Sequence, residues 1–225
     1  MSISDNMPFS SKCVFKETFY SLNQVQSYGG VVVAATVDRG ISPTGVNGRV
    51  TYGGTQNALV YATKATVRVR LRAGTARATL CPLISKCNTP IPDAQWIFLV
   101  STLNAPIFYV PNAAADFVNY CVANAALVVG QEYTLHAVYD GSLAAGSRVI
   151  LYRNGVLDAS VINGVIPVSM RANSVPITIF SYDGSAATAP SNDYFLRDAR
   201  VHAMAMSAAE VLDDYLNQTY VKVVP

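Results

Sequence analysis

Residues 128–158 read VVGQEYTLHAVYDGSLAAGSRVILYRNGVLD, and this stretch decides the fold class of the chain. Residues 131–139 alternate between two sets of side chains, which is typical of a strand with one face toward a core. Asp140-Gly141 then predicts a turn, because Asp bonds its own backbone and Gly accepts a positive φ. Residues 148–153 predict the next strand, and Asn154-Gly155 is a strong signal for a tight hairpin.

The same order of elements continues downstream, with a strand and turn at 177–185, a strand at 194–206 and a helix at 207–217. The segment from 130 to 217 resembles the laminin-G-like branch of the concanavalin A-like lectin and glucanase superfamily, although that family usually carries Trp where Tyr133 stands. The resemblance implies an all-β, two-sheet, concanavalin A-like jelly-roll sandwich with one short C-terminal helix. It implies no ligand, because lectins, hydrolases, adhesion modules and virion parts share this fold.

The C-terminal helix has clear signals in the sequence. Ser207 is a favourable N-cap, and Glu210 stands three residues later as its capping-box partner. Val211, Leu212 and Tyr215 recur at helical spacing and form a small apolar face. We therefore expect the helix to lie against one end of the sandwich.

The length of 225 residues fits one all-β unit, which we expect at 13–225 behind an N-terminal arm at 1–12. Charged residues make up only 13% of the chain, against about 25% in an average soluble domain, and the formal net charge is +2. A surface with so few charges is weakly protected against association, which favours contacts with other protein. The alternative is a tight monomer with a neutral polar surface.

The first residues lack the basic start and the apolar run of a secretion signal, and no window approaches the ~18 apolar residues of a membrane span. We therefore expect synthesis in a host cytoplasm and no association with a membrane. We also expect no nucleic acid partner, because the net charge is too small for counterion-driven affinity. Cys81 and Cys87 are spaced for a small disulfide loop, but a protein without a secretion signal favours free thiols.

Catalytic signatures are missing from the sequence. The three glutamates, Glu17, Glu132 and Glu210, lie far apart in the chain, whereas glycosidases need two carboxylates across the sugar bond. His136 and His202 both fall within predicted strands and face a sheet surface, and the G-x-S-x-G nucleophile motif is absent. The cysteines and histidines also lack the paired spacings of a zinc site. We therefore expect no enzyme activity and no cofactor.

Residues 66–72, TVRVRLR, place three arginines on one face of a strand, since side chains alternate along it. Arginine grips carboxylates and phosphates with two parallel hydrogen bonds, so this row predicts docking of an acidic partner surface or an anionic glycan. The alternative is a solvated sheet face, where like charges discourage wrong strand pairing. The row comprises Arg68, Arg70, Arg72 and, from the next strand, Arg77.

Two further kinds of site stay open at this level. Three aspartates stand in turns beside Gly, Ser or Asn, which suits calcium, although such residues also make tight turns without metal. Aromatic side chains near loops suit stacking on a sugar, although most aromatic residues of a sandwich belong to its core. The calcium candidates are Asp140, Asp183 and Asp193, and the glycan candidates are Trp96, Tyr182 and Tyr194.

These features together favour a non-catalytic structural or binding module. Stand-alone domains of the family that the chain resembles occur among phage head-decoration and fibre proteins, so the resemblance implies a phage or virus structural protein at the virion surface. Its partners would be other virion proteins or further copies of itself, as a homo-oligomer. The first alternative is a lectin-like module that recognises a cell-surface glycan, and the second is a hydrolase of unrecognised design.

Overall fold

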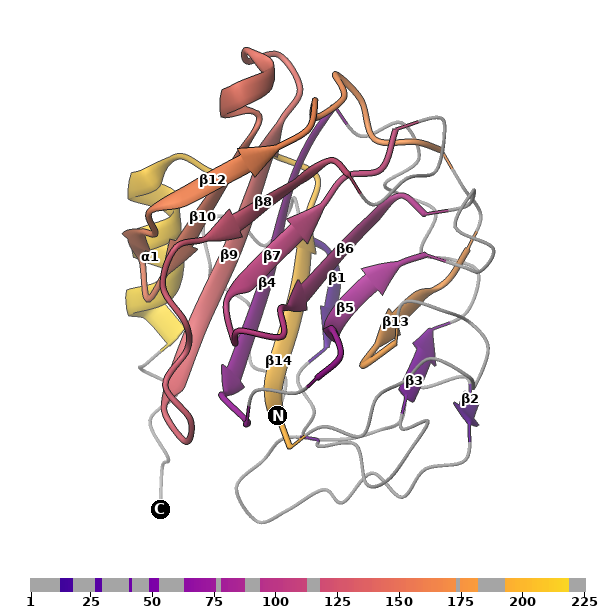
Figure 1. Cartoon of the computed structure of the whole chain (residues 1–225), viewed down its shortest axis with the longest axis vertical. Coiled ribbons are helices and arrows are strands. Elements are labelled where there is room, and N and C mark those ends of the chain that lie inside the picture. The colour runs from indigo at the N-terminus through magenta and orange to yellow at the C-terminus, as the bar shows by residue number, and fades with distance from the viewer. Residues whose placement is uncertain are drawn as a thin grey trace, which may run out of the picture.

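The computed structural model describes residues 13–17, 27–29, 41, 49–52, 63–75, 78–87, 94–112, 118–172, 175–181 and 193–218, with the backbone alone at 13–17, 27–29 and 49. These residues form two antiparallel sheets packed face to face, with one helix outside them (Figure 1). The expected all-β jelly-roll sandwich with a short C-terminal helix is confirmed. The arm expected at 1–12 lies outside the described residues.

The first sheet has six strands in the order β1-β14-β4-β9-β10-β11. The predicted turn at Asn154-Gly155 joins the last two strands, and both residues have a positive φ, 53° and 79°, as a tight hairpin requires. The strand bounds are β1 Cys13–Glu17, β14 Phe195–His202, β4 Lys64–Arg72, β9 Glu132–Asp140, β10 Val149–Arg153 and β11 Val156–Leu157.

The second sheet has eight strands in the order β12-β8-β7-β6-β5-β13-β3-β2. Cys81 begins β5 and Cys87 follows its last residue; both side chains are buried, and no disulfide joins them in the described part of the chain. The strand bounds are β12 Ser160–Asn163, β8 Tyr120–Ala123, β7 Pro106–Tyr109, β6 Trp96–Val100, β5 Cys81–Lys86, β13 Ile177–Ile179, β3 Arg49–Tyr52 and β2 Ser27–Gly29.

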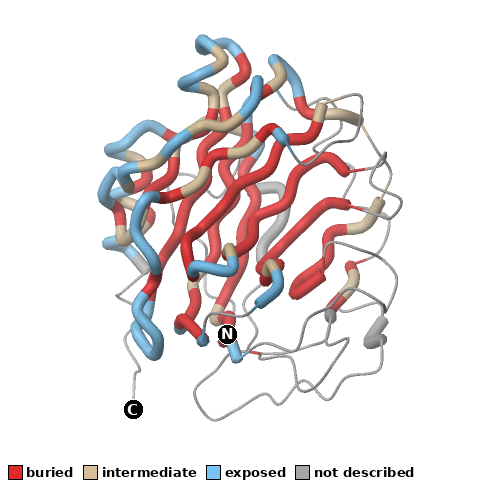
Figure 2. The backbone as a smooth tube through the Cα atoms, in the orientation of Figure 1, coloured by how far each residue is buried: buried red, intermediate tan, exposed pale blue. Residues whose placement is uncertain are grey.

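The main core lies between the two sheets, where the strands are buried along most of their length (Figure 2). Val67, Val69 and Leu71 of β4 point inward, as the alternation of 66–72 predicted, and meet the inner face of the second sheet. There Trp96 stacks on Phe108 with ring centroids 6.2 Å apart. Burial of these apolar side chains is the dominant favourable contribution to the sandwich.

Helix α1, Ala208–Gln218, follows β14 after a short connection. Its predicted capping box is confirmed, because the Ser207 backbone N–H donates to Glu210 Oε2 at 2.7 Å and the Glu210 N–H donates to Ser207 Oγ at 3.3 Å. The expected position of the helix is wrong, since it covers the outer face of the six-stranded sheet rather than an end of the sandwich. Val211 packs there on Val138 and Tyr152. No helix of the described residues is long and apolar enough to cross a membrane.

Candidate functional site

The arginine row of β4 lies on the outer face of the six-stranded sheet, but its members have different surroundings. Arg68 is 0% exposed, Arg70 is half-buried and Arg72 is exposed. Arg77 lies outside the described residues. Because helix α1 covers Arg68, the row is neither one docking stripe nor a solvated face, which corrects both expectations for this residue. Of the row's described members, Arg70 and Arg72 remain at the surface.

Asp214 joins helix α1 to the sheet. Its Oδ2 accepts a hydrogen bond from His136 Nε2 at 2.8 Å and lies 3.1 Å from Nε of Arg68, as an ion pair without hydrogen-bond geometry. Its Oδ1 is 3.7 Å from Nη1 of Arg200. Arg68 also bonds Asp198 of β14. We call the group the Asp214 cluster, and it comprises Arg68, His136, Asp198, Arg200, His202 and Asp214.

The electrostatics of the Asp214 cluster suit a structural contact. Burial alone raises the pKa of Asp214, but the hydrogen bond from His136 and the charge of Arg68 outweigh it and bring the pKa well below its usual value. Burial lowers the pKa of His136, which keeps the ring neutral at pH 7 although Asp214 opposes the shift. Nδ1 of His136 has no hydrogen-bond partner in the described part of the chain, so no hydroxyl or thiol there is poised against it.

His202 completes the buried histidine pair on this sheet. Sequence reasoning placed both histidines within strands and facing a sheet surface, and β9 and β14 hold them so. Neither ring nitrogen of His202 is hydrogen-bonded within the described ranges. Burial lowers the pKa of His202 to about 4, so this ring is neutral at pH 7.

The glycan candidates do not form a platform in the described part of the chain. Trp96 is fully buried between the sheets, where it stacks on Phe108. Tyr194 is 1% exposed, and its hydroxyl donates a hydrogen bond to Asn104. Tyr182 lies outside the described residues. A sugar cannot stack on the two buried rings without opening the core, so the expectation for Trp96 and Tyr194 is corrected.

The two described calcium candidates lie at opposite ends of β4. Asp140 receives a hydrogen bond from Lys64 Nζ at 2.9 Å, at the first residue of the strand. Asp193 accepts hydrogen bonds from the backbone and hydroxyl of Thr75, beyond the other end of the strand. One ion therefore cannot bind both carboxylates. Asp183 lies outside the described residues, and the described residues hold no group of three metal-ligating side chains.

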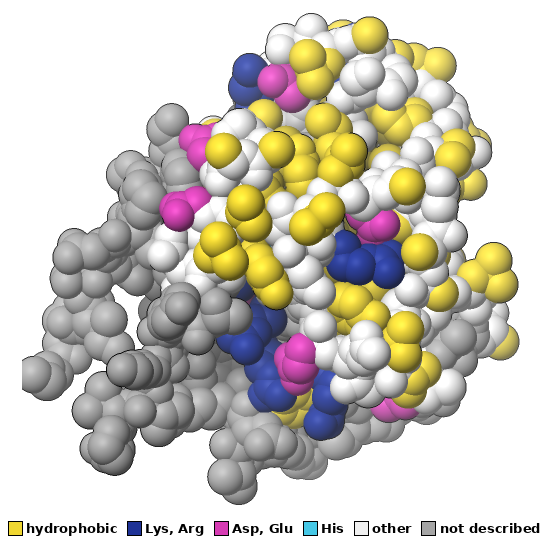
Figure 3. Space-filling view, turned by 90° about the vertical axis from the view of Figure 1, so that its left-hand side faces the viewer, with side chains coloured by type: hydrophobic (Ala, Val, Ile, Leu, Met, Phe, Trp, Pro, Cys, Tyr) yellow, Lys and Arg dark blue, Asp and Glu magenta, His cyan; other side chains and the backbone are white. Residues whose placement is uncertain are grey.

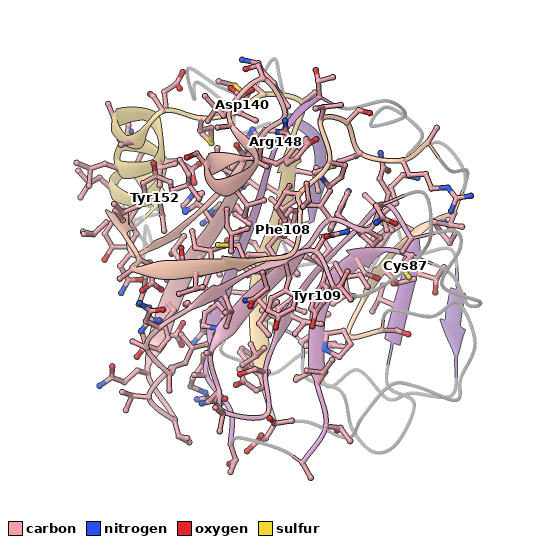
Figure 4. The ribbon with its side chains drawn as sticks, turned by 45° about the horizontal axis from the view of Figure 1, so that its top comes forward. Cys87, Phe108, Tyr109, Asp140, Arg148 and Tyr152 are labelled. Carbon is pink, nitrogen blue, oxygen red and sulfur yellow. The ribbon has the colours of Figure 1, made fainter. Side chains whose placement is uncertain are left out.

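A pocket of about 220 Å³ opens between the β9–β10 connection and the start of helix α1. Figure 4 shows Asp140 and Arg148 close together beside the 3-10 turn at Ala145–Ser147. The polar groups of the pocket are engaged, since Arg148 Nε donates to the Leu143 carbonyl at 2.9 Å and Glu210 belongs to the capping box. The remaining wall is apolar and is made by Val138, Leu143, Ile150, Ala205 and Met206.

Sequence reasoning missed an apolar surface beside this pocket. β11 and the outward side of α1 expose large hydrophobic side chains that adjoin one another, because a Cβ at Gly155 would lie 2.9 Å from Cδ1 of Leu212. Figure 3 shows hydrophobic side chains across the middle of this side of the molecule. We call it the α1–β11 face; its residues and exposed fractions are Leu157 64%, Leu212 42% and Leu216 49%. Val156, also exposed, stands opposite Arg153 and points to the other side of the hairpin.

One signal in the sequence could have indicated this surface. The predicted hairpin at Asn154-Gly155 is followed directly by Val156 and Leu157, where an edge strand in water is expected to carry polar side chains. Two adjacent apolar residues at such an edge indicate that something covers it. The contribution of Leu212 and Leu216 depends on how the helix docks, which periodicity alone does not specify.

Comparison with known proteins gives structural similarity alone. No family model and no curated protein matches the sequence. Trypanosoma rangeli sialidase in complex with sialic acid superposes with a TM-score of 0.66 at 13% identity, over 95% of this chain and 34% of the sialidase. The botulinum neurotoxin serotype G binding domain superposes with a TM-score of 0.65 at 14% identity, over 92% of this chain and 51% of that domain.

The serotype D/C VPI 5993 binding domain gives a TM-score of 0.65 at 12% identity, over 95% of this chain and 54% of that domain. The chain therefore spans about a third of the sialidase and half of the toxin binding domains that it matches. At these identities the likeness shows the two-sheet β-sandwich fold, and it assigns neither a ligand nor a reaction.

Proposed function

We propose that this protein is a non-catalytic binding module that acts through contacts with other protein. The observation that carries the proposal is the α1–β11 face, three exposed hydrophobic side chains on a helix and the adjoining edge strand. Single exposed apolar residues are ordinary on a soluble protein, but a contiguous group marks an interaction surface. The apolar pocket beside α1 extends this surface toward the β9–β10 connection.

The Asp214 cluster supports the non-catalytic part of the proposal. Its charged side chains are mostly buried beneath helix α1 and pair with one another, so their chemistry holds the helix on the sheet. A general base has to reach a substrate proton at hydrogen-bond distance. His136 is 0% exposed and its Nε2 is engaged by Asp214, so substrate has no access to it in this arrangement.

The setting that we propose is a virus or phage particle, with the protein as a capsid decoration or fibre component at the virion surface. The support is compositional, since only 13% of the residues are charged and the net charge is +2. Such a surface suits a protein whose neighbours cover much of it. Gradient-purified particles from the source should contain the chain at a fixed ratio to their other proteins, and its absence from them contradicts this setting.

Light scattering and a glycan array together test the binding mode. A protein-contact module should give a mass above the 24.1 kDa of one chain, or bind a defined particle protein, and should leave the array blank. Saturable glycan binding by a 24.1 kDa monomer overturns the proposal in favour of the lectin-like alternative.

A glycan-binding module is the second candidate function. The observation that favours it is the structural similarity over 92% of this chain to a structure described as the botulinum neurotoxin type G receptor binding domain. Because Trp96 and Tyr194 are buried, such a site would use other side chains. Mutation of Trp96 should then reduce glycan binding only as far as it reduces folding, which circular dichroism measures separately.

A further inference from the structure

We propose that the α1–β11 face binds a second copy of this chain, in a two-fold symmetric dimer whose axis lies across the strands of the six-stranded sheet. This inference rests on the proposed function, a module that works through protein contacts, and it names the partner and its orientation. It depends on two features of one side of the molecule: an apolar middle, and opposite charges at the two ends.

The apolar middle is continuous from the edge strand to the helix. Leu157 of β11 stands opposite Tyr152 of β10, whose ring packs under the helix against Val211. Leu212 and Leu216 are one helical turn apart and share a stripe beside the hairpin. Side chains that remain 42–64% exposed here gain most when a second apolar surface covers them.

One end of this side is basic. It contains Arg70, Arg72 and Arg197. Glu132 lies 2.6 Å from Nη2 of Arg197, while Asp198, opposite Arg70 in the strand pairing, is engaged by the buried Arg68. Arg72 and Arg197 lie over the ring of Phe195, at 5.3 and 5.0 Å from its centroid. In Figure 3, basic side chains gather around an acidic one at the lower end of this side. The local surplus is two positive charges.

The other end is weakly acidic. Glu210 and Asp213 stand on the first turns of α1, and Asp140 lies nearby at the end of β9, paired with Lys64. Arg148 directs Nε and Nη1 to backbone carbonyls. Three carboxylates against two cations leave a surplus of one negative charge. Figure 3 shows acidic side chains toward the upper left of the same side.

This arrangement is self-complementary under one rotation only. Asp140 and Glu132 mark the two ends of β9, eight residues and about 27 Å apart. A two-fold axis across the strands places the basic end of each copy on the acidic end of the other, and packs the apolar middles together. An axis along the strands would instead oppose basic ends to each other, which electrostatic repulsion disfavours.

A second copy fits this surface better than a sugar does. A sugar site needs polar groups that are free to bond hydroxyls, whereas the middle of the face is apolar and Ser207 and Glu210 already satisfy one another. A copy of the same chain brings the matching apolar area and the matching charges. A different protein or a glycan is therefore an outcome that the experiments below must distinguish.

The first experiment measures the mass of the full chain by light scattering over a dilution series. The wild type should reach about 48 kDa, twice the 24.1 kDa of one chain. Leu157→Glu and Leu212→Glu should each lower the mass to that of a monomer. The matched control is Leu103→Glu, which alters a 79% exposed leucine in the turn of the other sheet and should leave the dimer intact.

The second experiment separates a direct contact from loss of folding. Arg72→Glu and Asp213→Arg should each weaken the dimer, because each puts like charges opposite one another across the two-fold axis. When the two variants are mixed, the opposite charges meet again at both ends, and a heterodimer should form at the wild-type concentration range. Native mass spectrometry resolves the two homodimers from the heterodimer, and circular dichroism checks that both variants are folded.

Three outcomes overturn the inference. A wild type that stays at 24.1 kDa at every soluble concentration removes the dimer. An oligomer that survives both leucine variants uses another face, which contradicts the inference but leaves the protein-contact function standing. A mixture of the two charge variants that stays monomeric contradicts the orientation. A monomer that binds the glycan array contradicts the inference and the proposed function together.

Discussion

Asp214 reaches from helix α1 to three strands of the six-stranded sheet. It bonds His136 of β9, lies beside Arg68 of β4 and faces Arg200 of β14. Arg68 is fully buried, and burial is the main reason that its pKa is lowered, so it depends on carboxylates close by to remain charged. A buried guanidinium without such a partner destabilises the fold by far more than the intact pair stabilises it.

We therefore predict that Asp214→Ala lowers the free energy of unfolding by about 3–5 kcal/mol, the usual cost of leaving a buried charge without its partner. Urea denaturation followed by circular dichroism measures this change. Asp213→Ala is the matched control. In the described contacts the Asp213 carboxylate accepts a hydrogen bond from Asn217 at the surface of the helix. We expect its removal to change the free energy of unfolding by no more than about 0.5 kcal/mol. Equal losses for the two variants would contradict the role of Asp214.

His202 predicts a pH dependence of stability. Its pKa falls from 6.5 to about 4 on folding, because burial disfavours the charged ring. The folded state therefore binds fewer protons than the unfolded state between these values, and stability is full above pH 6.5 and declines as the pH falls toward 4. The buried His136 acts in the same direction.

Between pH 7 and pH 4.5 we expect His202 to contribute a loss of about 2–3 kcal/mol in the free energy of unfolding. Urea denaturation at the two pH values measures the loss, and His202→Leu should reduce it by about that amount. An unchanged pH dependence in the variant would show that other groups account for the acid sensitivity.

Helix α1 buries part of the outer face of the six-stranded sheet, including Val138, Tyr152 and Arg68. Its start is set locally by Ser207 and Glu210, while its position is set by contacts with Gly155, Val138 and Tyr152. Gly155 has a φ of +79°, and its missing Cβ leaves room for Leu212 and Tyr215. The hairpin and the helix can therefore approach closely only if this residue has no side chain.

Gly155→Ala should destabilise the protein by about 1 kcal/mol or more beyond the effect of Gly130→Ala. Both glycines have a positive φ, so both variants incur similar backbone strain. Only at Gly155 does the new Cβ meet other atoms, since nothing lies within 4 Å at Gly130. Thermal unfolding of the two variants measures the difference. Equal melting temperatures would mean that the helix moves away from β11 without a loss of stability.

At the scale of the whole molecule, the two faces of the six-stranded sheet have different roles. The inner face supplies the core, and α1 covers the part of the outer face beside β9 and β10 (Figure 1). The side that carries α1 and the edge strand β11 then combines exposed apolar residues with separated charges. The proposed dimer follows from that combination, since neither the helix nor the strand has it alone.

The dimer should weaken in salt, because ionic contacts at its ends are screened while its apolar middle is not. Two symmetry-related contacts of roughly 0.5 kcal/mol each correspond to a dissociation constant about fivefold weaker in high salt than in low salt. Light scattering of a dilution series at the two salt concentrations gives both constants. A dimer that tightens in salt would point to an apolar contact without the charge pairing that we propose.

Local rules were enough for much of the fold. Strict alternation identified β4 and β9, because one face of each strand meets the core. The φ preferences of Asn154-Gly155 identified the hairpin, and the capping box identified the start of α1. These features depend on residues within a few positions of one another, so the linear sequence contains their causes.

The surroundings of individual side chains needed the tertiary structure. Alternation placed Arg68 and His136 on an outer face, but only the docking of α1 decided that this face is enclosed and that Asp214 is their partner. Trp96 was open as a sugar platform until the packing of two sheets buried it. The sequence by itself thus determined the strands, turns and caps, whose causes are local. Enclosure and pairing were decided only when distant segments came together, such as those that carry Arg68 and Asp214, 146 residues apart.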